Sequence, residues 1–503
     1  VVCAFFLFFG NLCLLLYSRP CDSAADAPER AKHSFKMFPI AFQENITRLL
    51  GPEGGARLLA ALNDEAAPVS VRFNPLKGGA AAKAGLPVAE PVPWCADGFY
   101  LAERPQFTSD PLLHAGAYYV QEASSMFIAQ AFKQIDFDPR RVLDLCAAPG
   151  GKSTLWRALL PDDALLVANE PIRPRANILA ENLAKWGHPN VIVSNAYADG
   201  FAPLHSFFDV IAADVPCSGE GMFRKDRAAR EEWTDGSPAA CAARQWDIVS
   251  TVWPALRQGG YLVYSTCTFN REENEDTVWR IMKELGAEPV PIDCPAEWNI
   301  EGDLTGRGLP VNRFLPGRTR GEGLFLCLLR KTAEAPQPRE GKADKKKGAA
   351  AAKAKADKAL LALASGWLAE TEAFEIETDS DGNLRALPKS TAQDMRRVAA
   401  AVRTLSLGVP LAQPKGRDLI PCHSLALSTA LRREAFPKFE LSREDALRYL
   451  RREAVAPADT SLRGYALATY QGFPLGFAKA LAGRANNLYP KEWRIRTDYL
   501  QNT

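Results

Sequence analysis

The chain has 503 residues, of which 47% are hydrophobic and 24% are charged, and these values exclude wholesale disorder, a collagen triple helix and a coiled coil. At roughly 100–200 residues per domain, this length predicts about three domains. The 61 Lys and Arg nearly balance the 59 Asp and Glu, and a net charge of +2, taken alone, is weak evidence against a nucleic-acid partner.

The 11 cysteines are an odd number and show no paired framework. In a chain of this length, that pattern favours reduced thiols in a cytosolic protein over disulfides. There is no Cys-x-x-Cys pair and there are only 5 His, so the sequence predicts no zinc site.

The first 17 residues form an uncharged, apolar run that resembles the core of a signal peptide. The run lacks a basic segment before it, is slightly short for a spanning helix, and is followed by the first Met only at Met37. We interpret residues 1–36 as upstream translation that is not part of the native protein. A membrane or export segment is the alternative, and N-terminal sequencing of the native protein distinguishes the two.

Residues 37–130 read as an N-terminal module. The residues after Met37 predict an amphipathic helix with Phe42, Ile46, Leu49 and Leu50 on one side. A short strand is expected over Val69–Phe73, ending at Asn74-Pro75.

Residues 131–332 change to apolar runs that alternate with helical patterns. Helices are expected over Arg173–Trp186 and Ala242–Leu256, and strands over 142–146, 165–170, 191–195, 208–216 and 260–267. This alternation predicts an α/β fold built on a doubly wound parallel sheet with helices on both faces.

Residues 333–360 read as a Lys/Ala-rich linker, because 341–359 contain seven Lys and eight Ala but no large apolar residue. Residues 361–503 regain apolar content and end in an aromatic and basic stretch. Within them, 391–503 hold 18 Lys and Arg against 10 Asp and Glu. The near-neutral total therefore conceals a basic C-terminal part that could bind RNA, beside an acidic remainder.

The segment VLDLCAAPGGKS (142–153) runs from a predicted strand through Gly150 and Gly151 into a predicted helix. Glycines let a ligand approach the backbone, and a helix N-terminus offers free N–H groups. A phosphate loop would need Gly where Cys146 stands, and the G-x-G-x-x-G fingerprint is absent. Glu170 follows the next strand, where an acid typically binds ribose hydroxyls. These features predict a nucleoside ligand without a pyrophosphate, such as S-adenosylmethionine.

Two cysteines follow neighbouring predicted strands: Cys217, in Asp214-Val215-Pro216-Cys217, and Cys267, in Ser265-Thr266-Cys267. A single Cys at a strand end is usually a small core residue. Two Cys and an Asp at the same edge as a nucleoside loop are harder to explain by packing.

Methylation of cytosine at carbon 5 gives such residues a role. Carbon 5 is a poor nucleophile until a thiolate adds to carbon 6. The activated carbon 5 then takes the methyl group, a base removes its proton, and elimination frees the thiol. An acid must hold the pyrimidine edge during these steps.

The motifs resemble those of the Sun/RsmF-type RNA cytosine-5 methyltransferases, and most closely the bacterial RsmF-like 16S rRNA enzymes. They include CAAPGGK (146–152), Glu170, ADVPCSGEGMFRKD (213–226) and YSTCTFNREENE (264–275). VRFNPLKG (71–78), YVQEASSM (119–126) and the terminal LGFAKALAGRANNLYPKEWRIR extend the resemblance over the chain from Met37, apart from the linker. DNA cytosine-5 methyltransferases share a Pro-Cys but lack the Thr-Cys partner, so Cys267 favours RNA.

The resemblance implies the role of each site residue. Cys267 is the nucleophile, Cys217 assists product release, Asp214 contacts the cytosine and Lys152 lies beside the reacting centre. The cofactor-binding residues are Cys146, Ala147, Ala148, Pro149, Gly150, Gly151, Lys152, Glu170, Arg175, Asn195 and Asp214. Asp199 is an alternative to Asn195 beside the adenine, and Arg175 equally suits a solvated helix face.

The resemblance also implies a class I (Rossmann-like) methyltransferase sheet, with an N-terminal α+β RNA-binding module and a C-terminal PUA-like α+β region. We expect a cytoplasmic, monomeric enzyme without a membrane partner that uses S-adenosylmethionine on small-subunit ribosomal RNA or its assembly intermediate. One alternative is transfer RNA as the substrate. The other is a non-catalytic ribosome-assembly factor, against which the intact Asp214, Cys217 and Cys267 speak.

Overall fold

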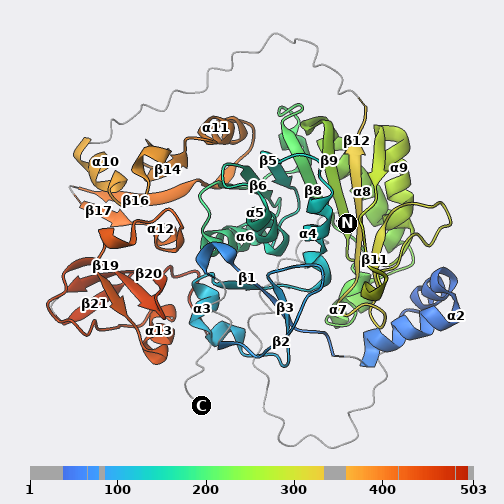
Figure 1. Cartoon of the computed structure of the whole chain (residues 1–503), viewed down its shortest axis with the longest axis horizontal. Helices are drawn as coiled ribbons and strands as arrows, with labels where there is room; N and C mark the ends of the chain where they lie inside the picture. The colour runs from blue at the N-terminus through green and yellow to red at the C-terminus, as the bar shows by residue number, and fades with distance from the viewer. Residues whose placement is uncertain are drawn as a thin grey trace, which may run out of the picture.

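The computed structural model describes residues 38–64, 66–78, 85–333, 358–416, 418–481 and 483–496 (Figure 1). The expectation for residues 1–36 falls outside the described residues, as does the expectation for most of the linker. The described chain contains a central nine-stranded sheet and three smaller antiparallel or mixed sheets.

The central sheet contains the five parallel strands expected from the sequence, in the spatial order β9-β8-β5-β6-β7. Their bounds are β5 Arg141–Asp144, β6 Leu165–Asn169, β7 Val191–Ser194, β8 Phe208–Asp214 and β9 Leu256–Thr266. The strand order reverses between β5 and β8, which places a ligand crevice at the carboxyl ends of these strands. The predicted doubly wound sheet is confirmed.

Antiparallel strands complete both edges of this sheet. Beyond β9, strand β12 (Leu324–Lys331) lies between β9 and β10 (Ala287–Val290), and β11 (Asn312–Phe314) pairs with β12. At the other edge, β15 (Thr404–Leu407) pairs with β7. This strand comes from beyond the predicted linker, so the C-terminal part of the chain completes the central sheet.

Helices cover both faces of the sheet because neighbouring residues of each strand face opposite sides. On β5, Val142 belongs to one buried core and Leu143 to the other. One face is covered by α4 Ile128–Lys133, α5 Gly151–Leu159 and α6 Arg173–Trp186, and the other by α8 Ser237–Val252, α9 Thr277–Leu285 and α11 Ala392–Ala401. The prediction for α6 is confirmed, whereas α8 begins and ends earlier than expected. Pro238 suits its first turn and Pro254 follows its end.

The predicted N-terminal module contains two separate packing units. Helix α2 (Ile40–Asp64) is kinked at Gly51 and buries Phe42 and Ile46, with Leu49 and Leu50 half-buried. It packs on Phe223 and Trp233, which precede and follow α7 (Arg227–Glu232) in the chain. Figure 1 shows α2 near α7. The second unit is a sheet in the order β2-β3-β1-β4, with bounds β1 Ser70–Phe73, β2 Val88–Pro91, β3 Gly98–Leu101 and β4 Tyr118–Val120. Helix α3 (Pro111–His114) precedes β4.

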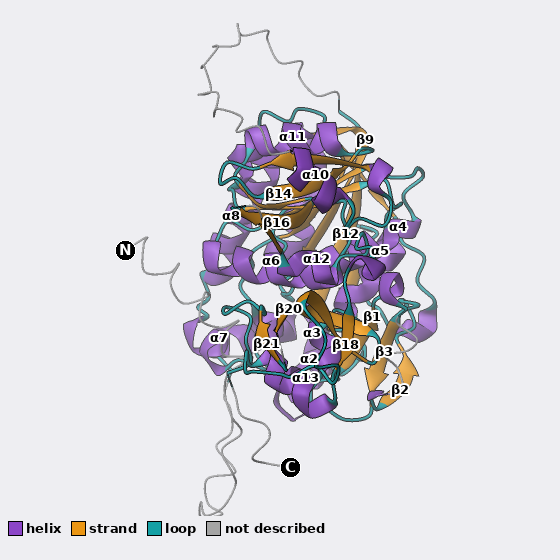
Figure 2. Ribbon diagram, turned by 90° about the vertical axis from the view of Figure 1, so that its left-hand side faces the viewer, coloured by secondary structure: helices purple, strands orange, loops and turns teal. Residues whose placement is uncertain are grey.

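The C-terminal part holds two four-stranded sheets. The first contains β13 Phe374–Thr378, β14 Leu384–Pro388, β16 Val409–Lys415 and β17 Asp418–Pro421. The second contains β18 Lys438–Glu440, β19 Gly464–Tyr470, β20 Phe473–Leu481 and β21 Arg484–Asn487. Helices α10 Lys358–Ser365, α12 His423–Leu427 and α13 Arg443–Leu450 accompany them. Helix α12 packs on α6 of the central layer (Figures 1 and 2).

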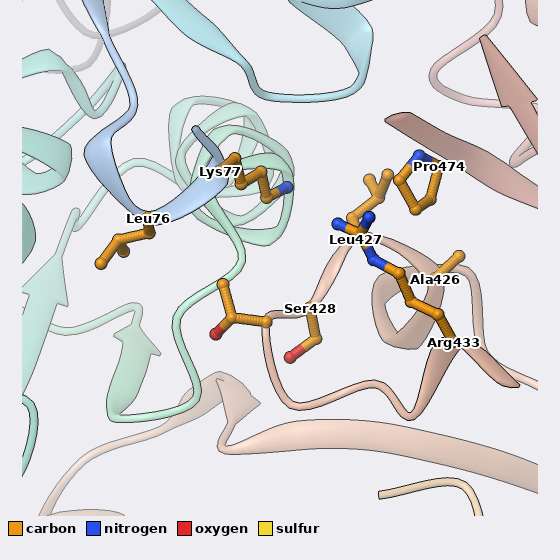
Figure 3. Close-up of a pocket in the computed structure, with 8 residues that line it drawn as sticks. Leu76, Lys77, Ala426, Leu427, Ser428, Arg433 and Pro474 are labelled. Atoms are coloured by element: carbon orange, nitrogen blue, oxygen red, sulfur yellow. The ribbon is translucent and has the colours of Figure 1, made fainter. Parts of the chain in front are cut away.

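The C-terminal end of α6 joins three parts of the chain. Its free carbonyls accept hydrogen bonds from the N-terminal part, with Asn74 Nδ2 at 3.1 Å from Trp186 O and Lys77 Nζ at 2.5 Å from Lys185 O. From the C-terminal part, the Thr429 amide donates to the carbonyl of Gly187 at 2.9 Å. A pocket of about 120 Å³ lies at this junction, lined by Leu76, Lys77, Ala426, Leu427, Ser428, Thr429, Arg433 and Pro474 (Figure 3).

Candidate active site

Two thiols meet at the carboxyl ends of β8 and β9. These strands are parallel neighbours with Asp214 beside Ser265, so the residues that follow them emerge together. Cys217 comes three residues after Asp214, and Cys267 directly follows β9. Their sulfur atoms are 3.1 Å apart, although 50 residues separate them in the chain. Two of the predicted catalytic residues are therefore in direct contact.

The third and fourth predicted catalytic residues form an ion pair beside these strands. Lys152, in the first turn of α5, places its Nζ 2.8 Å from Asp214 Oδ2. The hydroxyl of Ser265 donates to the other oxygen, Oδ1, at 2.8 Å. Burial acts to lower the pKa of Lys152, but the Asp214 carboxylate outweighs it and the pKa lies above its ordinary value. The arrangement holds one fixed carboxylate and one ammonium at the sheet edge.

The predicted glycine loop connects β5 to α5 at the same edge. The Ala147 amide donates to Asn169 O at 2.8 Å, which ties the loop to the end of β6. Gly150 adopts φ 118°, a left-handed conformation that favours glycine. A Cβ at Gly151 would lie 3.2 Å from the Tyr119 ring of β4, so the N-terminal sheet closes over the loop. Burial raises the pKa of the Cys146 thiol, which keeps it protonated.

The acid expected to bind ribose lies at the end of β6. Glu170 is 1% exposed, and its Oε1 accepts a hydrogen bond from the Ile172 amide at 3.0 Å. Its Oε2 lies 3.1 Å from Arg175 Nη1 yet accepts no hydrogen bond. Burial raises the pKa of Glu170. A buried carboxylate oxygen with unused acceptor capacity, next to a glycine loop, fits the ribose of S-adenosylmethionine.

The two candidates for the adenine position differ in what they contact. Asn195 uses its amide nitrogen to bridge the carbonyls of Glu170 and Pro171, each at 2.8 Å, so it fixes the turn that carries the acid. Asp199 lies exposed in a short 3₁₀ helix, Ala198–Phe201. Arg175 reaches across to Ala148 O at 3.1 Å and so links the acid to the glycine loop.

A buried polar network with no predicted role contacts the two thiol loops. Glu220 and Glu273 are 1% and 0% exposed and contact the loops that carry Cys217 and Cys267. Burial raises the pKa of Glu273 to about 7. The pKa of Cys217 is also raised, first by its hydrogen bond with Cys267 and then by burial. Both glutamates belong to the motifs given above, but the sequence does not indicate that their side chains are buried.

Within the described ranges, no group of His, Cys, Asp and Glu is arranged to hold a metal ion, and all eight described cysteines are free. Every helix among the described residues is too short or too polar to span a lipid bilayer.

Comparisons with known proteins agree with this geometry. Three family models match: 16S rRNA methyltransferase RsmB/F over residues 135–330, the N-terminal domain of 16S rRNA methyltransferase RsmF over 38–123, and the methyltransferase RsmF PUA domain over 436–495. Ribosomal RNA small subunit methyltransferase F of Klebsiella pneumoniae is 34% identical over 417 residues, which cover 80% of this chain and 84% of that protein. The same-named protein of Citrobacter koseri matches equally well.

Among solved structures, NSun6 from Pyrococcus horikoshii with SFG shares the fold, with a TM-score of 0.50 at 22% identity over 60% of this chain and all of that one. The central domain is a Rossmann-like methyltransferase sheet, preceded by an RsmF-type N-terminal domain and followed by a PUA domain. From its sequence, its sheet and the extent of these matches, the chain belongs to the RsmB/F family of 16S rRNA methyltransferases.

Proposed function

We propose that this protein methylates carbon 5 of a cytosine in 16S ribosomal RNA through a covalent adduct on Cys267. The observation that carries the proposal is the contact of the Cys217 and Cys267 sulfurs, 3.1 Å apart, at the sheet edge that also holds the Lys152–Asp214 pair. Two thiols in contact suit a reaction in which one attacks carbon 6 and the other assists release.

The two thiols have different surroundings, which supports different roles. Cys217 has a raised pKa, chiefly because it shares a hydrogen bond with Cys267, so it keeps its proton at neutral pH. A protonated Cys217 can donate a hydrogen bond to the sulfur of Cys267, 3.1 Å away. Cys267 is then the nucleophile and Cys217 the residue that helps free the methylated base.

The remaining site residues bind and orient the cytosine and the S-adenosylmethionine. Asp214 holds the cytosine edge while Lys152 balances its charge. The glycine loop 146–151, with Glu170, Arg175 and Asn195, surrounds the S-adenosylmethionine, which supplies the methyl group. After methyl transfer, a base removes the proton of carbon 5 and elimination returns Cys267 to its starting state.

RNA binding is assigned to the flanking parts. The PUA domain, together with the excess of basic residues in 391–503, supports contact with RNA phosphates. The relatives are named for the small-subunit ribosomal RNA, which favours 16S rRNA over transfer RNA. The free thiols of the described cysteines suit a cytoplasmic enzyme, and we propose that it acts there as a monomer on the small subunit or its assembly intermediate.

The test is to trap the protein–RNA adduct with the full-length protein, S-adenosylmethionine and unmethylated 16S rRNA. Cys217→Ala should accumulate a denaturation-resistant adduct, because release is blocked, while Cys267→Ala should form none. Both should lower steady-state methyl transfer by about 100-fold or more. Cys294→Ala, a partly buried thiol whose sulfur contacts Asn312, is the matched control and should keep wild-type activity.

Other outcomes would contradict the assigned residue roles, the substrate or the activity itself. An adduct on Cys267→Ala but not on Cys217→Ala would reverse the assigned roles. Methyl transfer to transfer RNA and not to 16S rRNA would change the substrate. No transfer to either RNA would leave the binding-factor alternative.

A further inference from the structure

Two buried carboxylates lie behind the reacting thiols, and each comes from one of the two cysteine loops. Glu220 follows Cys217 by three residues, in the short 3₁₀ helix Glu220–Met222, while Glu273 follows Cys267 by six. Both side chains are essentially inaccessible to solvent, at 1% and 0% exposure. A buried carboxylate is costly unless its oxygens are hydrogen-bonded, so their partners show what the burial achieves.

Glu220 reaches from the Cys217 loop to the loop that follows Cys267. Its Oε2 accepts hydrogen bonds from the Thr268 hydroxyl at 2.6 Å, the Phe269 amide at 2.8 Å and the Asn270 amide at 3.1 Å. These are the three residues directly after Cys267, so one carboxylate oxygen fixes the backbone that carries the nucleophile.

Glu273 makes the opposite connection. Its Oε2 accepts from the amide of Ser218 at 2.9 Å, and its Oε1 accepts from the Ser218 hydroxyl. Ser218 directly follows Cys217, so this carboxylate fixes the backbone that carries the second thiol. Gln245 of α8 and Asn270 also donate to Glu273, each at 2.7 Å, and hold the carboxylate in place.

The backbones of the two loops are also in contact. The Gly221 amide donates to Cys267 O at 2.8 Å, and a Cβ at Gly221 would lie only 2.4 Å from that oxygen. The hydroxyls of Ser218 and Thr268 are 3.0 Å apart. The two loops are therefore in direct contact, and the two glutamates cross-link them.

We propose that Glu220 and Glu273 are positioning residues that hold the two thiol loops together, in the arrangement that lets Cys267 attack the cytosine and Cys217 assist its release. The inference rests on the proposed function, which makes Cys267 the attacking thiol and Cys217 the thiol that assists release.

The experiment compares Glu273→Gln, Glu220→Gln and Glu272→Gln. Glu272 is the exposed neighbour of Glu273, so its replacement makes the same charge change without entering the network. Two readouts are needed. The first is methyl transfer to 16S rRNA, resolved into kcat and the KM for S-adenosylmethionine. The second is the rate at which iodoacetamide alkylates Cys217 as a function of pH, followed on the isolated peptide by mass spectrometry.

Both buried variants should lower kcat by about 10- to 100-fold with little change in KM, because misplaced thiols react slowly although the cofactor still binds. Glu273→Gln should also change the alkylation of Cys217, because the neighbouring Ser218 loses one of the two carboxylate oxygens that fix it. Glu272→Gln should match the wild type in both readouts.

Unchanged kcat in both buried variants, or an unchanged alkylation profile in Glu273→Gln, would overturn the inference. If Glu273→Gln does not fold, Ser218→Ala removes one donor to the same carboxylate and should lower kcat in the same way. Alkylation uses neither RNA nor S-adenosylmethionine, so it separates this inference from the proposed function. A Cys217→Ala protein that forms no RNA adduct defeats the latter alone.

Discussion

At the scale of single residues, the orientation of the Asp214 carboxylate is determined at both oxygens. Lys152 Nζ lies 2.8 Å from Oδ2 and the Ser265 hydroxyl donates to Oδ1 at 2.8 Å. One partner is charged and the other is neutral, so their removal should have unequal effects. The ion pair between the carboxylate and an ammonium contributes more than the hydrogen bond that the neutral hydroxyl donates to it.

Asp214→Asn should therefore lower single-turnover methyl transfer by about 100-fold or more, because an amide nitrogen would face the Lys152 ammonium and the charge that holds the cytosine is lost. Ser265→Ala leaves the ion pair intact and should cost only about 3- to 10-fold. Binding of S-adenosylmethionine, measured by calorimetry, is the control and should change little in Ser265→Ala. Equal losses in the two variants would contradict this ranking.

At the scale of elements, the parallel strands and the glycine loop could be predicted because each produces a local pattern. Buried parallel strands are continuous apolar runs, and β6 and β7 are buried over their whole lengths. The proximity of Cys217 and Cys267 could also be predicted from the sequence, because both come soon after strands of one sheet. Contacts between segments that are distant in the chain could not be predicted, because they leave no local pattern in the sequence.

Strand β15 is the clearest example of an element whose pairing partner could not be predicted from the sequence. It spans only four residues, Thr404–Leu407, of which the first three are half-buried and the last is buried, so nothing in its sequence identifies β7 as its partner. Helix α2 is another example, since its amphipathic face was evident but its docking on Phe223 and Trp233 was not. The inward direction of Glu220 and Glu273 was equally hidden, because exposed and buried glutamates look alike in a sequence.

Because β15 completes the central sheet, a change in it should destabilise the catalytic part. Leu407 is 4% exposed and belongs to the core beneath α8 and α11. Leu407→Ala should lower the free energy of unfolding by about 2–4 kcal/mol, measured by urea denaturation followed by tryptophan fluorescence. Ser406→Ala, at a half-exposed position of the same strand, should stay within about 0.5 kcal/mol of the wild type. A neutral Leu407→Ala would mean that the strand is dispensable.

At the scale of the whole molecule, the C-terminal end of α6 is where the N-terminal, catalytic and C-terminal parts meet. Backbone atoms approach closely there: a Cβ at Gly187 would lie 2.2 Å from Leu427 O, and one at Gly116 would lie 1.8 Å from Lys185 O. Both glycines have positive φ. Such contacts leave little space for water, so the titratable groups of the junction lose solvation.

His423 is one of the titratable groups that lose solvation at this junction. It begins α12, packs edge-on against Tyr489 and Trp493 at ring distances of 4.9 and 5.0 Å, and neither ring nitrogen has a hydrogen-bond partner among the described residues. Burial, reinforced by the charges of Lys185 and Lys77, lowers the pKa of His423 to about 3. The folded protein therefore holds the imidazole neutral where the unfolded chain would already protonate it.

The resulting prediction concerns stability against pH. Below the ordinary histidine pKa of about 6.5, the unfolded state binds a proton that the folded state does not bind, so the contribution of this histidine to stability should fall as pH drops from about 6.5 towards 3. For one such histidine the limiting slope is about 1.4 kcal/mol per pH unit. His114 and His188 are also buried with pKa values lowered to about 3 and should add to the slope. His423→Phe should reduce the slope by one histidine's share in urea titrations between pH 7.5 and 5. Tyr489→Phe, which removes a hydroxyl from the neighbouring ring, should retain the full slope, and an unaltered slope in His423→Phe would show that this imidazole is protonated in the folded protein.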